Sequence, residues 1–441
     1  TIPSPAGSTS ASLRGVSCVT AAFCEAVGSY SDNSGDTLDV AASWNGQSWA
    51  LQSTPPLAGV PFASLNAVSC AAVTACEAGG DFSFTTSQTQ YVPVAEHWNG
   101  ASWSPQHAAA APGATSNALT GVSCVSAAFC EAVGSRQDHL GLTTIALAEV
   151  WNGVRWKIQP TANPAQASGG LRMSLSGVAC ASASFCEAVG SSASTAGGGA
   201  ERWNGKTWVL QAAPGGPLTS VSCPSAKFCM AAGGDGHVEI WNGSSWSSKS
   251  SAAGFISLRS VSCLSPTACE AIGSGPSGDQ AERWNGRSWS PQVTPTPTGG
   301  SSLGLTAVSC ARLTSCEAVG SYSNSAFQQV PLAEVWNGSA WKLQHAPNPG
   351  SSAFSSAALN AVWCTSPTLC TAVGQFSNAL NFTLAEVWNG STWSLRSTPS
   401  YLYAGQNTLS AVSCTAGPVC RAVGVTDDLG QIPATLIETG N

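Results

Sequence analysis

Pairs of cysteines recur along the chain at one constant spacing. In each pair the second cysteine follows the first by six positions, and nine such pairs account for all 18 cysteines. First cysteines of successive pairs lie 40 to 56 residues apart, a period at which each repeat forms one small sheet that buries its faces only against its neighbours. The spacing therefore predicts nine repeats in one body. The pairs are Cys18–Cys24, Cys70–Cys76, Cys124–Cys130, Cys180–Cys186, Cys223–Cys229, Cys263–Cys269, Cys310–Cys316, Cys364–Cys370 and Cys414–Cys420.

Each cysteine pair is flanked by two stretches that resemble strands. Leu-x-x-Val-Ser-Cys leads into the pair and Cys-Glu-Ala-Val-Gly-Ser leads out of it, and both are short, apolar and rich in β-branched residues. The five residues between the cysteines form a tight connection, which a disulfide would stabilise by roughly 2 kcal/mol on the chain-entropy model. We therefore predict nine disulfides, each within one repeat.

A second hairpin follows in eight of the nine repeats, marked by the motif Trp-Asn-Gly-x-x-Trp. Asn-Gly is the preferred pair for a two-residue type I′ turn, because both central residues need positive φ. With the turn at residues 152–153, Trp151 is expected to face Val154 and Glu149 to face Trp156. Glu149 and both tryptophans would then share one face of the sheet. The motif opens at Trp44, Trp98, Trp151, Trp203, Trp241, Trp284, Trp336 and Trp388, and only Trp363 of the 17 tryptophans lies outside it.

Four antiparallel strands per repeat, stacked about an axis, are typical of a β-propeller. The chain resembles secreted bacterial propellers with kelch-like or Asp-box-like blades, since the Gly-x-x-Trp end of each hairpin, as at residues 390–393, is similar to the end of an Asp-box. Tryptophan replaces the aspartate that defines that motif, so sialidase chemistry does not carry over. The resemblance implies an all-β fold, a single propeller of nine four-stranded blades over residues 1–441, with one disulfide in each blade.

The ninth repeat is incomplete, because no Trp-ending fourth strand follows its third. Residues 1–5 resemble the segment 397–400 that ends a fourth strand, so residues 1–12 are expected to complete the last blade. The alternative is a strand donated by another molecule, which gives homo-assembly through the open blade edge. The predicted repeats are 13–64, 65–118, 119–174, 175–217, 218–257, 258–304, 305–358, 359–408 and 409–441.

Composition restricts the partners and the compartment. Charged residues make up only 9% of the chain, and the 16 basic residues are scattered against a net charge of −7, so no phosphate-binding stripe is present and nucleic acid is not expected. Paired cysteines at constant spacing indicate an oxidising compartment. We therefore expect a secreted or cell-surface protein without membrane insertion, with Thr1 at the start of a processed chain.

Metals and cofactors are not expected. Zinc is disfavoured because the cysteine spacing differs from the usual two-residue knuckle and the five histidines follow no repeat. Residues 32–36 faintly resemble a calcium loop, but the later bidentate glutamate is missing.

The variable segments are expected to carry the function. In a propeller the connections between strands 2 and 3, and those between blades, emerge at one end, whereas the cysteine connections and Asn-Gly turns lie at the other. Aromatic residues gather in these variable segments, and on a neutral polar surface they suit the apolar faces of sugars. The alternative is that each ring only anchors its own loop. The predicted ligand-binding residues are Tyr30, Tyr91, Tyr322, Tyr401, Tyr403, Phe82 and Phe376, accompanied by Phe84, Phe327 and Phe382.

Acidic residues fall into a repeated set and a nonrepeated set. Glutamates recur directly after the second cysteine and two positions before the hairpin tryptophan, and a group needed once per molecule would not recur in this way. We therefore assign them a structural role. Catalytic candidates must break the repeat, and Asp138, His139, Asp427 and Asp428 are the ones singled out, although solvated turn residues explain them equally well. The other nonrepeated members are Asp32, Asp36, Asp39, Asp81, Asp235, His237 and Asp279.

Three functions fit these observations. The leading one is a non-catalytic extracellular binding or scaffold propeller whose ligand is a glycan or a cell-surface protein. The second is a secreted glycoside hydrolase or polysaccharide lyase with a groove among the variable loops. The third is a structural subunit that self-assembles.

Overall fold

The computed structural model is built from β-strands arranged in the order of the predicted repeats. Among the described residues no helix is long and apolar enough to cross a bilayer. The chain divides into two compact units, Pro3–Lys249 and Ser250–Asn441. We call the antiparallel sheet of each repeat a blade. The structure describes residues 5, 7–20, 22–46, 48–54, 59–84, 90–106, 113–138, 140–141, 143–163, 170–171, 173–193, 197–213, 215–233, 238–248, 257–275, 278–349, 356–378, 380–398, 404–414, 420–428 and 433–440.

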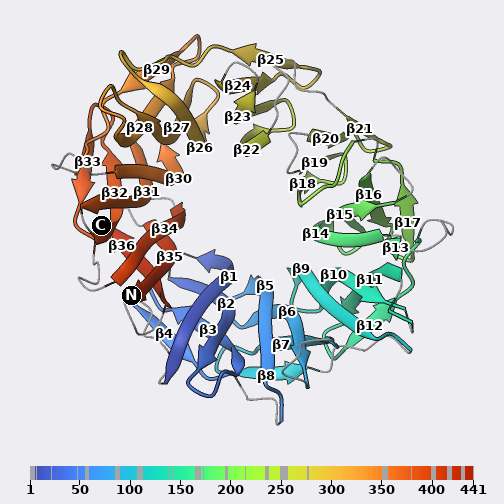
Figure 1. Cartoon of the computed structure of the whole chain (residues 1–441). Helices are drawn as coiled ribbons and strands as arrows, with labels where there is room; N and C mark the ends of the chain where they lie inside the picture. The colour runs from blue at the N-terminus through green and yellow to red at the C-terminus, as the bar shows by residue number, and fades with distance from the viewer. Residues whose placement is uncertain are drawn as a thin grey trace. The chain divides into compact units, whose positions relative to one another are not determined.

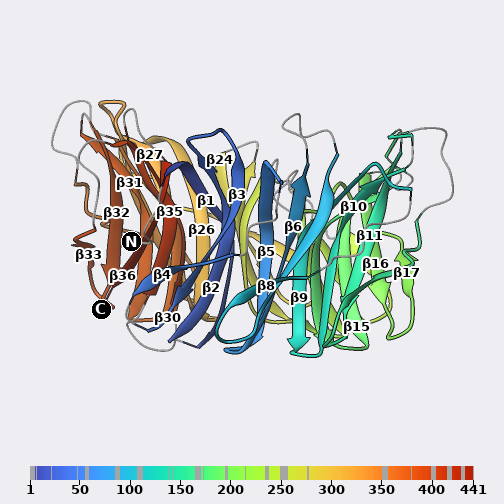
Figure 2. The same ribbon diagram turned by 90° about the horizontal axis from the view of Figure 1, so that it is seen from below.

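The N-terminal unit holds blades 1 to 5 (Figure 1). Strands pair in sequence order within each blade, and the first strands of successive blades are neighbours. Blade 1 has β1 (Ser8–Thr20), β2 (Phe23–Asp32), β3 (Thr37–Trp44) and β4 (Trp49–Gln52); blade 2 has β5 (Phe62–Ala72), β6 (Ala75–Ser83), β7 (Val92–Trp98) and β8 (Trp103–Gln106). Blade 3 has β9 (Ser116–Ser126), β10 (Phe129–Gln137), β11 (Thr143–Trp151) and β12 (Trp156–Gln159), with β13 (Gly170–Leu171) added beside β11. Blade 4 has β14 (Met173–Ser182), β15 (Phe185–Ser192), β16 (Gly197–Trp203) and β17 (Trp208–Gln211); blade 5 has β18 (Ser220–Ser225), β19 (Phe228–Ala232), β20 (Val238–Trp241) and β21 (Trp246–Ser248). In Figure 2 the long strands β5, β6 and β9 lie alongside one another.

The C-terminal unit holds blades 6 to 9, and its described residues give blade 9 three strands. Blade 6 has β22 (Ser257–Ser265), β23 (Ala268–Gly275), β24 (Gly278–Trp284) and β25 (Trp289–Gln292); blade 7 has β26 (Ser301–Arg312), β27 (Ser315–Ser323), β28 (Gln329–Trp336) and β29 (Trp341–Gln344). Blade 8 has β30 (Ser356–Ser366), β31 (Leu369–Asn378), β32 (Leu380–Trp388) and β33 (Trp393–Arg396); blade 9 has β34 (Ala404–Cys414), β35 (Cys420–Asp428) and β36 (Pro433–Gly440).

The first strand of the chain starts earlier than the repeat pattern suggested. β1 begins at Ser8, which pairs with Asp32 of β2, so residues 8–12 belong to blade 1 and not to a fourth strand of blade 9. Completion of blade 9 by the N-terminus stays a prediction, now restricted to the residues before Ser8.

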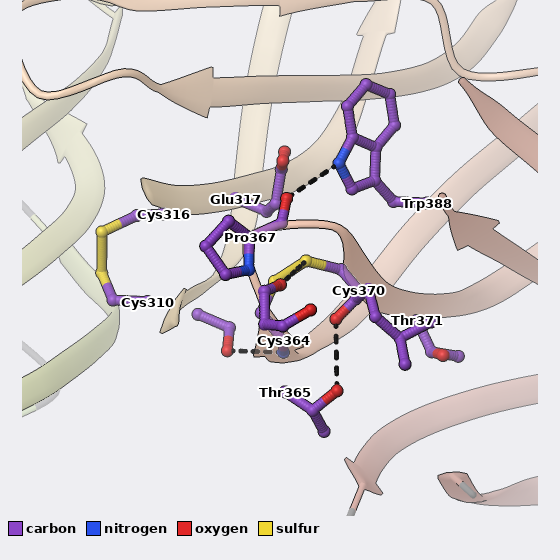
Figure 3. Close-up of a disulfide and its surroundings, with 12 residues drawn as sticks. Cys310, Cys316, Glu317, Cys364, Thr365, Pro367, Cys370, Thr371 and Trp388 are labelled. Atoms are coloured by element: carbon purple, nitrogen blue, oxygen red, sulfur yellow. Dashed lines mark hydrogen bonds between the residues drawn. A yellow bond between two sulfur atoms is a disulfide. The ribbon is translucent and has the colours of Figure 1, made fainter. Parts of the chain in front are cut away.

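The nine predicted disulfides are all present and no cysteine is free. Each bridge joins two residues that face each other across the first hairpin of its blade, as Cys124 and Cys130 do. Figure 3 shows the bridge of blade 8 next to Trp388, whose indole Nε1 donates to the carbonyl oxygen of Pro367 in the cysteine connection at 3.2 Å. The disulfide and the first hairpin tryptophan thus fix the same connection from two sides.

In every blade except blade 5, the described residues show a β-bulge of the first strand opposite a glycine of the second strand. In blade 3 the pairing shifts by one residue between Val133 and Gly134, opposite Leu119 and Gly121. A Cβ added at Gly134 would lie 1.9 Å from the carbonyl oxygen of Ala118. The glycine four residues after the second cysteine recurs in all nine repeats, so its role is to let the first strand bend over the second.

The predicted register of the second hairpin is wrong. Trp151 pairs with Trp156, and Glu149 pairs with Ile158, so the loop spans four residues instead of two. The side chain of Asn152 explains the longer loop, because its Oδ1 accepts from the backbone N–H groups of residues 154 and 155, each at 3.0 Å, as Asn side chains do in turns. Gly153 supplies the positive φ of 87°. The shift is by two positions, so the predicted common face of Glu149 and the two tryptophans is retained.

The hydrophobic core lies between blades. One cluster joins Val319 of blade 7 to Leu359, Leu384 and Trp393 of blade 8, and an equivalent cluster joins blades 3 and 4 in the N-terminal unit. Small residues dominate the contacting faces, as in Ala333 and its neighbours. A thin sheet of this kind buries its apolar surface only by stacking on the next one.

Two sets of hydrogen bonds connect successive first strands. In the first set, the serine before one first cysteine accepts from the N–H of the first cysteine of the next blade, at 2.9 to 3.0 Å. The second set comes from the bulge residue, since Thr120 and Thr306 donate to the leucine carbonyl oxygen of the next blade at 2.8 and 2.7 Å. Blade 8 departs from the first set, because Trp363 replaces the serine and is 42% exposed.

Replacement of a bulge glycine should be strongly destabilising. Gly134→Ala places its methyl group inside the van der Waals radius of a backbone oxygen, so we expect a loss of more than about 2 kcal/mol in the free energy of unfolding. The matched control is Gly35→Ala, where φ is 86° and no atom lies within 4 Å of the added Cβ; it should cost about 1 kcal/mol. Guanidinium denaturation of both variants measures the difference, and an unchanged midpoint for Gly134→Ala would contradict the role of the bulge.

Candidate functional site

The glutamates that follow the second cysteine are buried inside the blade stacks. Their exposed fractions are between 0 and 3%, which removes them from solvent and from any substrate. The members are Glu25, Glu77, Glu131, Glu187, Glu270 and Glu317.

A hydrogen-bonded relay connects three of these glutamates, Glu25, Glu131 and Glu317, to the next blade. In blade 3, Gln159 Nε2 donates to Glu131 Oε1 at 3.2 Å, and Trp208 Nε1 of blade 4 donates to Gln159 Oε1 at 2.5 Å. In the other unit, Gln344 Nε2 donates to Glu317 at 3.2 Å and accepts from Trp393 Nε1 at 2.6 Å. Gln159 and Gln344 therefore each link a buried carboxyl group of their own blade to a tryptophan of the following blade, whereas Gln106 of blade 2 donates to Ser104 Oγ at 3.4 Å.

The glutamine was missed by the sequence reasoning, although the sequence contains its signal. Trp-x-x-Gln ends the fourth strand in six of the eight complete repeats, at Gln52, Gln106, Gln159, Gln211, Gln292 and Gln344. The two exceptions are blades 5 and 8.

Burial shifts the proton equilibrium of these carboxyl groups. Desolvation raises the pKa of Glu131 and of Glu317 to about 8, while the hydrogen bond from the glutamine opposes the rise. The same cause raises the pKa of Glu25 and Glu270 to about 7. These glutamates recur in the blade interfaces and carry a proton near neutral pH. Both properties support the structural role that was assigned to them from the sequence.

The glutamates before the hairpin tryptophan are buried as well and face the preceding blade. Glu201 of blade 4 accepts from the backbone N–H of Ala162 at 2.9 Å. Glu96 of blade 2 shares a hydrogen bond with Asp39 of blade 1, and burial together with the Asp39 carboxyl raises the pKa of Glu96 to about 10. Asp39 is only 6% exposed, so this nonrepeated acid is also enclosed between blades.

The nonrepeated acids in the loops cap turns. Asp138 Oδ1 accepts from the N–H of Leu140 at 3.1 Å, and Asp32 Oδ1 accepts from the N–H groups of Ser34 and Asp36 at 2.8 and 3.0 Å. These contacts fit the turn interpretation. His139, Asp235 and His237 lie outside the described residues, and Asp427 and Asp428 are described only as backbone of β35. Catalysis by these residues stays an untested prediction.

Four of the predicted aromatic residues occupy one repeat position, six residues after the second cysteine. This position lies one or two residues before the end of the second strand, and in each case the side chain is half-buried and the residue pairs with one near the start of the third strand. The sequence reasoning did not recognise the shared position. Its occupants are Tyr30, Phe82, Tyr322 and Phe376.

In blade 7 this position borders a pocket of about 320 Å³. Tyr322 forms one wall, and its ring packs against Gly300 of the connection from blade 6. Leu343 and His345 at the end of β29 form the facing wall. The pocket thus lies where a blade meets the connection that enters it.

Blade 8 has a pocket of about 430 Å³ at the equivalent position. Phe376 and Phe382 face each other across β31 and β32, with ring centroids 5.0 Å apart and planes inclined by 21°. Leu395 and Arg396 of β33 and Pro349 of the connection complete the lining. Two adjacent blades therefore present the same type of aromatic-lined hollow at the end that carries the variable segments.

The remaining aromatic candidates do not line these two pockets. Tyr91 packs edge-on against Phe62 at 5.6 Å, and Phe82 packs against Phe84 at 5.1 Å, which fits the interpretation that these rings anchor loops. Tyr30 and Tyr91 belong to the N-terminal unit, whereas Tyr401 and Tyr403 lie outside the described residues. Ligand binding by these residues stays a prediction.

Metal ligands were not expected. Within the described parts of the chain, no three His, Cys, Asp or Glu side chains converge as a metal site.

Comparison with known proteins finds similarity in structure but not in sequence. No protein-family model matches the chain, and no curated protein matches it. The chain is similar to the computationally designed Ika8 protein, with 10% identity and a TM-score of 0.48 over 99% of this chain and 98% of that one. It is also similar to YCF48 from Cyanidioschyzon merolae, with 14% identity and a TM-score of 0.38 over 70% and 93%, and to the WD40 β-propeller domain of Doa1, with 11% identity and a TM-score of 0.35 over 73% and 92%. Because the identities are this low, no ligand carries over from these proteins.

The raised carboxyl pKa values predict that stability falls as the pH rises. For Glu131 the pKa is raised from 4.5 to about 8 in the folded state, so the folded protein binds this proton more tightly than the unfolded chain. The stabilisation is complete below about pH 4.5 and is lost as the pH rises through about 8. We expect the melting temperature to fall between pH 5 and pH 9.

Glu131→Gln tests the cause of this pH dependence. The amide keeps an oxygen acceptor for Gln159 and cannot ionise, so it should stabilise the protein at pH 9 by more than about 1 kcal/mol and change little at pH 5. Asp36→Asn, at an accessible turn, controls for the loss of one negative charge. A pH profile of melting temperature that is identical for Glu131→Gln and the parent protein would refute the buried Glu131 carboxyl group as a source of the pH dependence.

Proposed function

We propose that the protein is a secreted, non-catalytic binding propeller whose ligand is a carbohydrate held at the variable end of its blades. The observation that carries this proposal is the pair of equivalent pockets in blades 7 and 8, each lined by an aromatic ring and by aliphatic side chains. Such hollows suit the apolar face of a sugar ring. The nine disulfides support an oxidising extracellular compartment.

The buried carboxyl groups favour binding over hydrolysis. The repeated glutamates are enclosed between blades and hydrogen-bonded there, and the described nonrepeated acids cap turns or are buried. A glycosidase needs two carboxyl groups facing the scissile bond. The proposal also includes one propeller of nine blades, supported by the stacking of consecutive blades in each unit.

The pockets give a direct test of the binding proposal. The full chain is screened on a glycan array, and the strongest ligand is then titrated by calorimetry into Tyr322→Ala and Phe376→Ala. We expect each variant to bind at least about fivefold more weakly, since aromatic contacts contribute about 1 kcal/mol.

Val154→Ser is the matched control, because Val154 is 78% exposed in an Asn-Gly turn at the other end of a blade. It should bind normally and melt normally. Normal binding by both aromatic variants, or loss of binding by Val154→Ser, would place the working surface elsewhere. Release of reducing sugar during incubation would support the hydrolase alternative instead.

A further inference from the structure

Blade 8 departs from the carboxyl relay at both of its positions. Thr371 stands where six other blades have glutamate, and Arg396 stands where they have glutamine. The same two positions change together in blade 5, to Met230 and Lys249. In the eight complete repeats the glutamate and the glutamine therefore occur together or are replaced together.

Arg396 is not needed to hold blade 8 to its neighbour. Thr371 makes a contact of its own across that interface, with its Oγ1 3.0 Å from Cys420 Sγ of blade 9. The described residues of blade 9 supply no fourth-strand tryptophan that would bond to residue 396. Among the described residues no acceptor pairs with the Arg396 guanidinium, and its side chain is exposed. Blade 8 therefore has an exposed guanidinium, without a hydrogen-bond acceptor in the described part of the chain, at the position where the relay of other blades has a hydrogen-bonded amide.

This cation lies on the wall of the blade 8 pocket. Arg396 lines the hollow together with Leu395, Pro349 and the stacked rings of Phe376 and Phe382. In the equivalent pocket of blade 7 the same wall position is Gln344, whose amide is occupied by Glu317 and Trp393. Both pockets have an aromatic ring in the wall, and they differ in charge at this position.

The arginine and the two aromatic rings of this pocket together indicate the chemistry of its ligand. A guanidinium presents a planar fork of N–H donors that matches a carboxylate, and a single such group suits a single negative charge. Flat aromatic faces beside it suit a saturated ring with one apolar side. We propose that the blade 8 pocket binds a uronic acid residue of a polysaccharide, with Arg396 pairing the carboxylate and the Phe376–Phe382 wall contacting the sugar ring. This inference rests on the carbohydrate-binding function proposed above.

A sugar fits this pocket better than an acidic peptide does. Extended peptides gain affinity by adding a strand to a sheet edge, and the edge strand here, β33, has only four residues. The side chains of Thr383 and Thr398 are hydrogen-bonded to each other at 2.8 Å, so the polar side chains left for a ligand are those of Arg396 and Ser397, and only Arg396 is charged.

Comparison of a charged ligand with its uncharged ester measures the contribution of the carboxylate to binding. Tetragalacturonate and its methyl ester are titrated by calorimetry into the full chain. The parent protein should bind the acid at least about tenfold more tightly than the ester, since a hydrogen bond to a charged group contributes about that much. Arg396→Gln should remove this preference and leave binding of the ester unchanged. Arg396→Lys should retain part of it, because the charge stays and the fork is lost.

Arg155→Gln provides a charge-matched control. Arg155 is exposed in the turn of blade 3, and its replacement changes the net charge by the same amount. It should keep the full preference for the acid. The melting temperature of each variant reports on folding.

The outcomes separate this inference from the function on which it rests. Failure of tetragalacturonate to bind at millimolar concentration, or an undiminished acid preference in Arg396→Gln, overturns the uronate assignment. If neutral glycans bind on the array in that case, the carbohydrate-binding proposal stands. If no glycan binds at all, both proposals fail. Equal binding of a tetraglutamate peptide that also depends on Arg396 would show that the pocket selects a carboxylate without selecting a sugar, which overturns the assignment as well.

Discussion

Each blade of this protein depends on its neighbours because a four-stranded sheet has two faces and no interior of its own. The apolar clusters form between blades, and the polar groups trapped there must find partners across the same interface. The Trp–Gln–Glu relay meets this requirement by joining a tryptophan of one blade to a buried carboxyl group of the preceding blade. The serine and threonine bonds between first strands do the same closer to the disulfides. The stacking of the blades, the bends of their first strands and the raised pKa values of the buried carboxyl groups all follow from this need for partners across the interface.

Most acidic residues recur from blade to blade, and for this reason they do not indicate a catalytic site. A buried glutamate that recurs in blade after blade is part of an interface, and its raised pKa is a consequence of burial. The proposed ligand site instead lies where both residues of the relay are replaced. In blade 8 the glutamate and the glutamine of the relay are both absent, and an arginine is left exposed beside two phenylalanine rings. In blade 8, the replacement of both relay residues therefore coincides with an exposed arginine on the pocket wall.

The sequence predicted the repeats, the strands around each cysteine pair and all nine disulfides, because constant spacing encodes them directly. It did not predict the hairpin register, since the Asn-Gly pair favours a two-residue turn until the Asn152 side chain is seen bonding the next two N–H groups. Tyr322 and Phe376, which were predicted as ligand-binding residues, line the two pockets, whereas Arg396 was not among the predicted residues. Both pockets also need a connection, as at Pro349, and the packing of a connection cannot be derived from periodicity.

The central claim is that repeated residues hold the blades together while the departure in blade 8 binds the ligand. Hydrogen–deuterium exchange with and without tetragalacturonate tests it most directly, because backbone protection reports which segments the ligand stabilises. The account predicts slower exchange in peptides that cover β31 to β33 of blade 8 and no change in the equivalent segments of blades 1 to 4. Equal protection of all blades, or protection confined to the Asn-Gly turns, would contradict it.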